Sequence, residues 1–368
     1  MSCVNPLFSL PNVFDLSWPD ICSSVDNHLK GSIPSELGLL TALEHIDLNG
    51  NYIVGSIPST LSGLHQLTYL GLHSNNITGS FPQWITDLSN LEGLALGDNR
   101  LTGSFPPSMG EMTKLAILAV DDNQMTGNID FMSHLTYLEF LYVENNSFTG
   151  TLNSIFMREC FYLVHLDASD NQLTGVLPVH FFYTHLHPRL EVIDLSNNQL
   201  TGGITTILPT NRQVEFLAMQ GNPLGGSLPG AISHLEALTH LDLSDNGLTG
   251  PIPADIGSLT DLEYLFLANN GFQPGRIPDS FAGLTKLQDL SLQDTQRTGA
   301  IPTWFRRFDR LFLLDLKQNQ LVGKVPKELS DMKFLAFLLL SNNTLSGEFP
   351  TELAELRILS EFCCVAVC

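Results

Sequence analysis

Residues 43–58 read LEHIDLNGNYIVGSIP, and residues 67–82 read LTYLGLHSNNITGSFP, which is the same pattern 24 positions later. In both stretches apolar residues alternate with other residues, an Asn follows, and a Gly and a Pro close the pattern. Self-similarity at a fixed period of this length is the signature of a repeat architecture. The pattern recurs along most of the 368 residues, so the repeat decides the fold.

The repeats align on the Asn, at steps of 23 to 27 residues and usually 24. The aligned positions are Asn27, Asn51, Asn75, Asn99, Asn123, Asn146, Asn171, Asn198, Asn222, Asn246, Asn270, Thr295, Asn319 and Asn343. This alignment divides the chain into a partial N-terminal cap at residues 1–26, about 14 repeats at 27–352, and an incomplete terminal repeat at 353–368.

Each part of the repeat has a physical reason. The two-residue alternation predicts a strand in which Leu70 and Leu72 point into the core while Tyr69 points out. An Asn amide can both donate to and accept from the backbone groups that a turn leaves buried. Pro starts a return segment whose apolar spacing favours 3₁₀ or short helical turns. We expect 13 parallel concave strands, from near Leu43 to near Leu340.

Two departures from the pattern predict local irregularity. Three extra residues within 179–189 indicate a bulge on the convex side. In a later repeat Thr295 replaces the Asn and Arg297 replaces a core Leu. Because a buried guanidinium needs partners, we expect a local defect there.

The chain is acidic, with a formal net charge of -21. Residues 1–275 hold 27 of the 38 Asp and Glu but six of the 17 Lys and Arg, whereas the remainder is balanced. This charge argues against nucleic acid and favours neutral or basic partners. No run of 18 apolar residues predicts a membrane span. The N-terminus lacks the basic region of a signal peptide, so the chain is either intracellular or a piece of a longer product.

The second half of each repeat resembles a known family. The stretches TGSFP at 78–82 and TGPIP at 249–253 are similar to the plant-type leucine-rich repeat. That family includes the ectodomains of receptor-like kinases, receptor-like proteins and polygalacturonase-inhibiting proteins. The resemblance covers about residues 23–362 and implies an α/β repeat solenoid: a right-handed superhelix with a concave parallel sheet and a convex side of 3₁₀ or short helices.

The cysteines leave alternatives open. In the resembled family the N-terminal cap carries Cys pairs and a Trp; WPDIC at 18–22 looks like a shortened cap, with Cys3 a possible disulfide partner of Cys22. Three cysteines near the C-terminus form a closing bridge or remain free thiols, according to the compartment. They are Cys363, Cys364 and Cys368. Cys160 is expected to be a buried core residue.

Aromatic and acidic residues occupy outward columns of the concave strands. Exposed aromatics grouped on such a face are typical anchors of recognition, although aromatic residues also simply suit strands. The candidate ligand-binding residues are Tyr69, Phe140, Tyr142, Phe216, Tyr264 and Phe266, with Asp121, Asp122, Asp167 and Asp194 beside them. On this interpretation Tyr142→Ala weakens binding but leaves stability nearly unchanged, whereas Leu141→Ala costs about 2–5 kcal/mol of folding free energy.

Catalytic chemistry has little support in the sequence. His–Asp pairs such as His165 with Asp167 lie several repeats apart and are explained by repeat ancestry. His180, His185 and His187 lack a Cys or carboxylate at ligand spacing, so we expect no metal and no cofactor. No nucleotide-binding or hydrolase motif is present.

The leading hypothesis is a non-catalytic recognition module, receptor-like or secreted, that binds a protein, peptide or glycan. An intracellular scaffold and an inhibitor of a secreted glycosidase are the alternatives. N-x-S/T sequons at Asn76, Asn145 and Asn342 favour an extracellular or cell-surface location over the cytoplasm, and predict glycosylation there.

Overall fold

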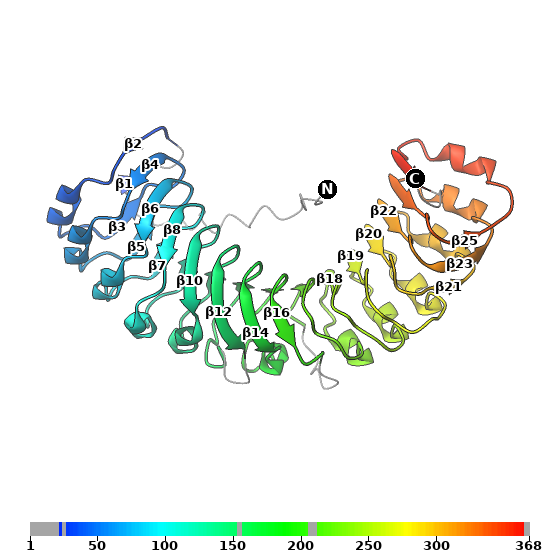
Figure 1. Ribbon diagram of the computed structural model, residues 1–368, viewed down its shortest axis with the longest axis horizontal. Coiled ribbons are helices and arrows are strands. Elements are labelled where there is room, and N and C mark those ends of the chain that lie inside the picture. Colours follow the sequence, from blue (N-terminus) through cyan, green and yellow to red (C-terminus); the bar gives the residue numbers. More distant parts are fainter. Residues whose placement is uncertain (1–21, 24–26, 153–156, 205–211, 364–368) are drawn as a thin grey trace.

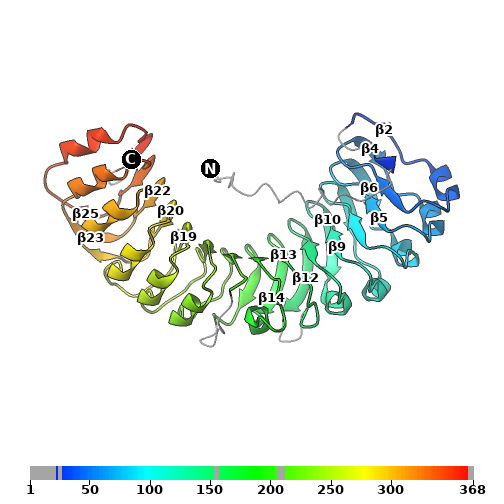
Figure 2. The ribbon, with the colours of Figure 1, turned by 180° about the vertical axis from the view of Figure 1, so that it is seen from behind.

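A computed structural model describes residues 22–23, 27–152, 157–204 and 212–363. These residues form an open crescent in which every repeat contributes one strand to the inner face (Figure 1). The same arc seen from behind has its short helices along the outer rim (Figure 2). The leucine-rich-repeat solenoid expected from the sequence is confirmed.

The concave face is a 15-stranded parallel sheet in which sequential repeats are neighbours. Its strands are β1 (Cys22–Ser23), β3 (His45–Asp47), β5 (Tyr69–Gly71), β7 (Gly93–Ala95), β9 (Ile117–Ala119), β11 (Phe140–Tyr142), β13 (His165–Asp167), β15 (Val192–Asp194), β17 (Phe216–Ala218), β18 (His240–Asp242), β19 (Tyr264–Phe266), β20 (Asp289–Ser291), β22 (Leu313–Asp315), β24 (Phe337–Leu339) and β26 (Glu361–Cys363). The predicted 13 strands are β3 to β24. The number was too small because the backbone also pairs at both ends, where the side-chain pattern has faded.

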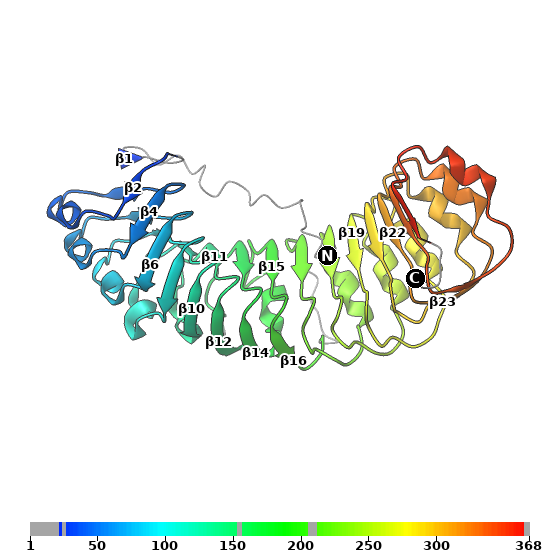
Figure 3. The ribbon, with the colours of Figure 1, turned by 45° about the horizontal axis from the view of Figure 1, so that its top comes forward.

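A second parallel sheet lies on one flank and was not expected (Figure 3). Its eight-stranded part contains β2 (Lys30–Gly31), β4 (Tyr52–Gly55), β6 (Asn76–Ser80), β8 (Arg100–Gly103), β10 (Gln124–Asn128), β12 (Ser147–Leu152), β14 (Gln172–Val176) and β16 (Gln199–Thr201). Three further strands pair near the C-terminal end: β21 (Thr298–Gly299), β23 (Gln320–Gly323) and β25 (Thr344–Leu345). In this segment the Gly takes a positive φ, for example 95° at Gly79, but the residues before it are extended and pair.

Most return segments of the described chain are 3₁₀ helices of four or five residues, whereas residues 157–159 form a turn. The helices are η2 (Ser35–Leu39), η3 (Ser59–Gly63), η4 (Gln83–Asp87), η5 (Pro107–Glu111), η6 (Asp130–His134), η7 (Val179–Phe182), η8 (Gly230–His234), η9 (Ala254–Ser258), η10 (Asp279–Gly283), η11 (Thr303–Arg307), η12 (Lys327–Asp331) and η13 (Thr351–Glu355). Most follow an extended Pro, such as Pro58 with φ −67° and ψ 136°. In this part of the chain no helix is long and apolar enough to cross a bilayer.

One continuous apolar core runs through the repeats between the strands and the 3₁₀ helices. The expected register is confirmed, because Leu70, Leu72 and Leu141 are fully buried. Cys160 is confirmed as a buried free thiol. Of the other cysteines, Cys3, Cys364 and Cys368 lie outside the described residues, as does most of the expected N-terminal cap.

Within residues 179–189, where the sequence predicts a convex bulge, some side chains are buried while Thr184, His185, Pro188 and Arg189 are exposed. Phe181, Phe182 and His187 are completely buried, and His180 is only 4 % exposed. In this longer repeat, the side chains of Phe181 and Phe182 therefore point into the core and are shielded from solvent.

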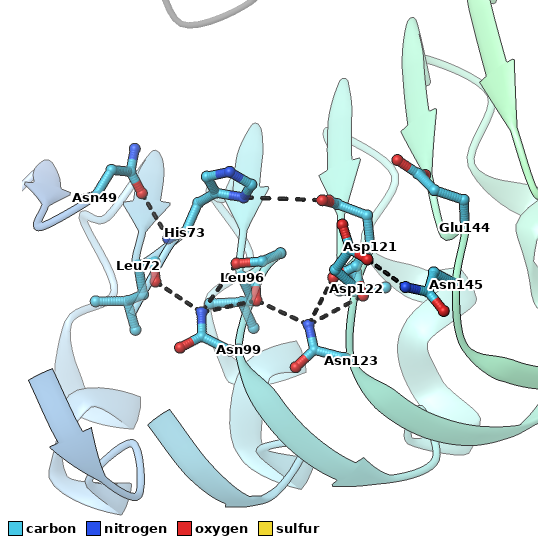
Figure 4. Close-up of polar contacts among 12 residues, drawn as sticks. Asn49, Leu72, His73, Leu96, Asn99, Asp121, Asp122, Asn123, Glu144 and Asn145 are labelled. Atoms are coloured by element: carbon cyan, nitrogen blue, oxygen red, sulfur yellow. Dashed lines mark hydrogen bonds and ion pairs between the residues drawn. The ribbon is translucent and has the colours of Figure 1, made fainter. Parts of the chain in front are cut away.

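A ladder of buried Asn amides joins the turns that follow the concave strands. The Asn75 Nδ2 group donates to the carbonyls of Leu48, Leu72 and His73 at 3.0–3.2 Å, and its Oδ1 accepts the Ile53 amide at 3.0 Å. Asn99 and Asn123 form the next two rungs (Figure 4). Each amide therefore connects neighbouring repeats, as its recurrence in an apolar column suggests.

The predicted defect at Arg297 is resolved by hydrogen bonds. Arg297 is 2 % exposed, and its Nη2 donates to the carbonyls of Gln273 and Thr295, both at 2.6 Å. Burial lowers the pKa of the guanidinium to about 10, which leaves it charged at neutral pH. The concave sheet passes this point unbroken through β19, β20 and β22, but the flanking sheet has only isolated bridges between β16 and β21.

We expect Arg297→Met to lower the free energy of unfolding by about 1–3 kcal/mol, because two buried carbonyls lose their donors. Denaturant unfolding would measure it, with Arg100→Met as the exposed control. The double variant Thr295→Asn with Arg297→Leu restores the residues of the other repeats and should recover part of the loss. An Arg297→Met protein as stable as the wild type would show that the guanidinium contributes nothing.

Candidate functional site

The strand register fixes which outward side chains are neighbours on the concave face. Tyr142 lies between Ala119 and Asp167, and Asp167 lies beside Asp194. Beyond Asp194, the same column continues with Ala218, Asp242 and Phe266 on the next three strands. The candidate residues therefore do share one face, as the alternation predicts.

Tyr69 is on that face but is not exposed, which corrects the sequence expectation. It is 6 % exposed and stacks on His45 with ring centroids 4.5 Å apart. A Cβ added at Gly71 or Gly93 would come within 2.7 Å or 2.6 Å of the Tyr69 ring. The ring thus lies flat across two glycines, one of them on the next strand, and is covered by its neighbours.

Tyr142 is buried in the same manner. It is 4 % exposed, packs over Ala95 and Ala119, and lies 4.7 Å from His165 between ring centroids. The expectation that Tyr142→Ala barely changes stability is therefore wrong, because the substitution would remove a packed ring. Phe140, on the same strand, remains half-buried.

Aromatic side chains that remain accessible gather on three adjacent strands. We call Phe216, His240, Tyr264 and Phe266 the aromatic patch; they come from β17, β18 and β19. His240 is buried at the centre, with Phe216 stacked on it at 4.3 Å and Tyr264 at 5.4 Å between ring centroids. Phe216, Tyr264 and Phe266 are half-buried and face the concavity. His240 was not among the predicted site residues, although its column position between Phe216 and Tyr264 could have identified it.

Carboxylates form a second group on the neighbouring strands. We call Asp121, Glu144, Asp167 and Asp194 the acidic stripe; they come from β9, β11, β13 and β15 or the residues directly after them. Figure 4 shows Asp121 facing His73, with 3.9 Å between Oδ2 and Nδ1, and Glu144 on the next strand. Gly97 lets the Asp121 carboxylate reach this position, since a Cβ at residue 97 would overlap it.

Asp122 does not belong to the stripe. It is exposed in the turn after β9 with φ 47°, and it accepts a hydrogen bond from Asn145 Nδ2 (Figure 4). Glu144 takes its place on the face. The column of the repeat could have shown this, because residue 144 corresponds to residue 121 one repeat earlier.

Burial and mutual repulsion make these carboxylates weak acids. Burial, followed by the charge of Asp194, raises the pKa of Asp167 to about 7. Burial is also the main cause that raises the pKa of Asp121 to about 6 and the pKa values of Glu144 and Asp194 above their ordinary range. Because the ionised form is disfavoured in this environment, each group would gain from a nearby positive charge.

The histidines show no arrangement for metal or acid–base chemistry. Burial lowers the pKa values of His165, His187 and His240 to about 4, so they are neutral rings in the folded chain. His180 and His187 pack 5.4 Å apart between ring centroids, whereas the His185 ring contacts Tyr183. Among the described residues no three His, Cys, Asp or Glu side chains are placed to hold a metal ion.

The stability of the Asp167→Asn variant, relative to that of the wild type, should increase as the pH rises. Between about pH 4 and about pH 7 the unfolded chain releases the Asp167 proton while the folded chain retains it, so the wild type loses stability over this range. We expect the unfolding free energy of the variant to gain about 1–2 kcal/mol on the wild type. The neutral histidines are common to both proteins and cancel. Denaturant unfolding across this pH range, with exposed Asp255→Asn as the control, measures the difference; a constant difference would contradict it.

Solved structures similar to this chain include plant receptors. The plant peptide hormone receptor RGFR1, in complex with RGF2, is 31% identical with a TM-score of 0.80, over 91% of this chain and 57% of the receptor chain. A TDR receptor is 27% identical with a TM-score of 0.81, over 92% and 58%. The Arabidopsis receptor kinase HAESA, in complex with the peptide hormone IDA and the co-receptor SERK1, is 29% identical with a TM-score of 0.74, over 93% and 65%. This chain thus spans less than two thirds of their length.

Sequence comparison leads to the same family. Leucine-rich-repeat family models match residues 25–77 and 65–125, and again 162–183, 189–211, 237–259 and 261–284. No curated protein matches the sequence significantly. The repeat motif, the parallel concave sheet with its Asn ladder, and these matches together show that the chain belongs to the plant-type leucine-rich-repeat proteins.

Proposed function

We propose that this chain is the recognition part of a non-catalytic, receptor-like protein, and that it binds a peptide or protein ligand on its concave face. The observation that carries this proposal is the aromatic patch beside the acidic stripe. Accessible aromatic rings that line a concave sheet are suited to bury against a partner, and aromatic anchors contribute most of the affinity in many interfaces.

The similar structures support a peptide ligand. RGFR1 is described as a peptide hormone receptor in complex with RGF2, and HAESA is in complex with the peptide hormone IDA. This chain shares the repeat architecture of both over nine tenths of its length. Its acidic stripe adds a preference of its own, since carboxylates speed association with basic partners and fix their register.

An extracellular location fits the surface of the chain. The sequon residues Asn76, Asn145 and Asn342 are all exposed, the last two in turns with φ 49° and 56°. Exposed turn positions leave room for a glycan. The similar structures include the ectodomain of a plant membrane receptor kinase, 29% identical with a TM-score of 0.74.

When the chain is expressed behind a secretory signal, we expect glycan on at least one of the three sequons. Mass spectrometry before and after enzymatic deglycosylation detects it, and Asn→Gln at each site assigns it. The same chain made in the cytosol is the unmodified reference. Secreted, folded protein without any glycan would remove the sequons as support for this location.

Phe266→Ala should weaken ligand binding about thirtyfold with little loss of stability, because the ring is half-buried on the concave face and anchors the partner. Its neighbour Leu265 points into the core, so Leu265→Ala should instead cost about 2–5 kcal/mol of folding free energy. Peptides selected from a random linear library on the wild-type chain provide the ligand, and fluorescence anisotropy measures their affinity.

Tyr52→Ala is the matched control, since Tyr52 is 51 % exposed but lies on the flanking sheet. Selected peptides should bind this variant as they bind the wild type. Peptides whose affinity is the same for Phe266→Ala and the wild type would place the binding surface elsewhere and overturn the proposal.

A further inference from the structure

No Lys or Arg of the described chain forms an ion pair with the acidic stripe. Lys and Arg form their ion pairs at other positions, such as Arg189 with Glu139 and Arg212 with Glu236. Among the ion pairs of the described residues, the one that involves the acidic stripe joins His73 Nδ1 to Asp121 Oδ2 at 3.9 Å. Four carboxylates on consecutive strands therefore have little compensating charge.

Polar atoms at the centre of the stripe also lack hydrogen-bond partners. The Tyr142 hydroxyl and Glu144 Oε2 are both buried, and neither has a partner among the described residues. Tyr142 is 4 % exposed, and after burial the charges of Glu144, Asp167 and Asp121 raise its pKa, which places the hydroxyl among these carboxylates. Buried polar groups without partners are uncommon and call for an explanation.

The stripe and the aromatic patch lie a fixed distance apart. Asp167 and Phe266 occupy the same column, four strands apart in the sheet order, and the centre of the patch at His240 is three strands away. Neighbouring strands are about 4.8 Å apart, so the separation is roughly 14–19 Å. An extended chain that rises about 3.3 Å per residue covers this distance in four to six residues.

We propose that the concave face selects an extended peptide segment with a Lys or Arg over the acidic stripe and a large apolar residue, four to six positions away, over the aromatic patch. This inference rests on the proposed function and specifies the chemistry of its ligand. Ala218 and Asp242 lie between the two groups in this column, and Ala218 is covered by its neighbours, with 1 % of its surface exposed.

A basic side chain suits the stripe because it supplies both charge and donors. Asp167 Oδ1 already accepts hydrogen bonds from the amide and hydroxyl of Ser169 at 3.0 and 2.7 Å, and Asp194 Oδ1 accepts the Ser196 amide at 2.9 Å. Their second carboxylate oxygens are the acceptors that remain for a ligand. A guanidinium presents donors in a fork that matches two carboxylate oxygens, and an ammonium presents three.

The proposal is tested by selecting peptides from a random linear library on the full chain, at neutral pH and low salt. The sequences of the selected peptides are then determined. We expect enriched peptides to carry Lys or Arg and an aromatic or large aliphatic residue four to six positions apart. For one such peptide, Asp167→Asn should weaken binding at least tenfold, an effect that added salt reduces. Asn can still accept the Ser169 hydrogen bonds, so the substitution keeps the local structure.

Two further variants separate the outcomes. Exposed Asp255→Asn, on the convex η9, should leave affinity unchanged, and replacing the basic residue of the peptide with norleucine should abolish the difference between Asp167→Asn and wild type. Peptides that depend on Phe266 but carry no basic residue, or carry it at no fixed spacing, would overturn this inference and leave the proposed function intact. Peptides that ignore both Phe266 and Asp167 would overturn both.

Discussion

The buried Asn amide is the interaction on which the rest of the molecule depends. Each repeat turns sharply after its concave strand, and the turn would otherwise leave carbonyl and amide groups buried without partners. Asn75 satisfies three carbonyls and one amide that belong to two neighbouring repeats. This repeated contact joins the turns of neighbouring repeats and so helps to hold their strands side by side.

Much of the architecture could be predicted from the sequence, because its causes recur within each repeat. The Leu columns, the Asn ladder and the Pro-led return segments each have a local reason that 24 residues contain. The flanking sheet could not be predicted in the same way, because each of its two-to-six-residue strands is short: a strand such as Gln172–Val176 has one buried apolar residue, Leu173, between two polar ones, which is too brief a pattern to indicate a sheet. These strands form because the Asn ladder already holds neighbouring backbones side by side.

The binding face was predicted less well, for a reason that a single repeat does not contain. Column position indicates which side chains point outward, and this was right for Phe216, Tyr264 and Phe266. Exposure, however, depends on the residue in the adjacent repeat. Tyr69 is buried because Gly71 and Gly93 leave space for its ring, and Tyr142 because Ala95 and Ala119 do. Arg297 is similar: whether its guanidinium finds partners is decided by a carbonyl one repeat earlier, at Gln273.

The glycines beneath Tyr69 and Asp121 also bear on how such an array can change. Gly93 and Gly97 belong to the same repeat. The Tyr69 ring that covers Gly93 comes from the preceding repeat, and the Asp121 carboxylate beside Gly97 comes from the following repeat. An exchange of one repeat for another would separate each small residue from the side chain it accommodates, and a new Cβ there would meet a ring or a carboxylate. On this part of the face, the unit that recombination or engineering can transplant with both contacts intact is therefore a block of three successive repeats.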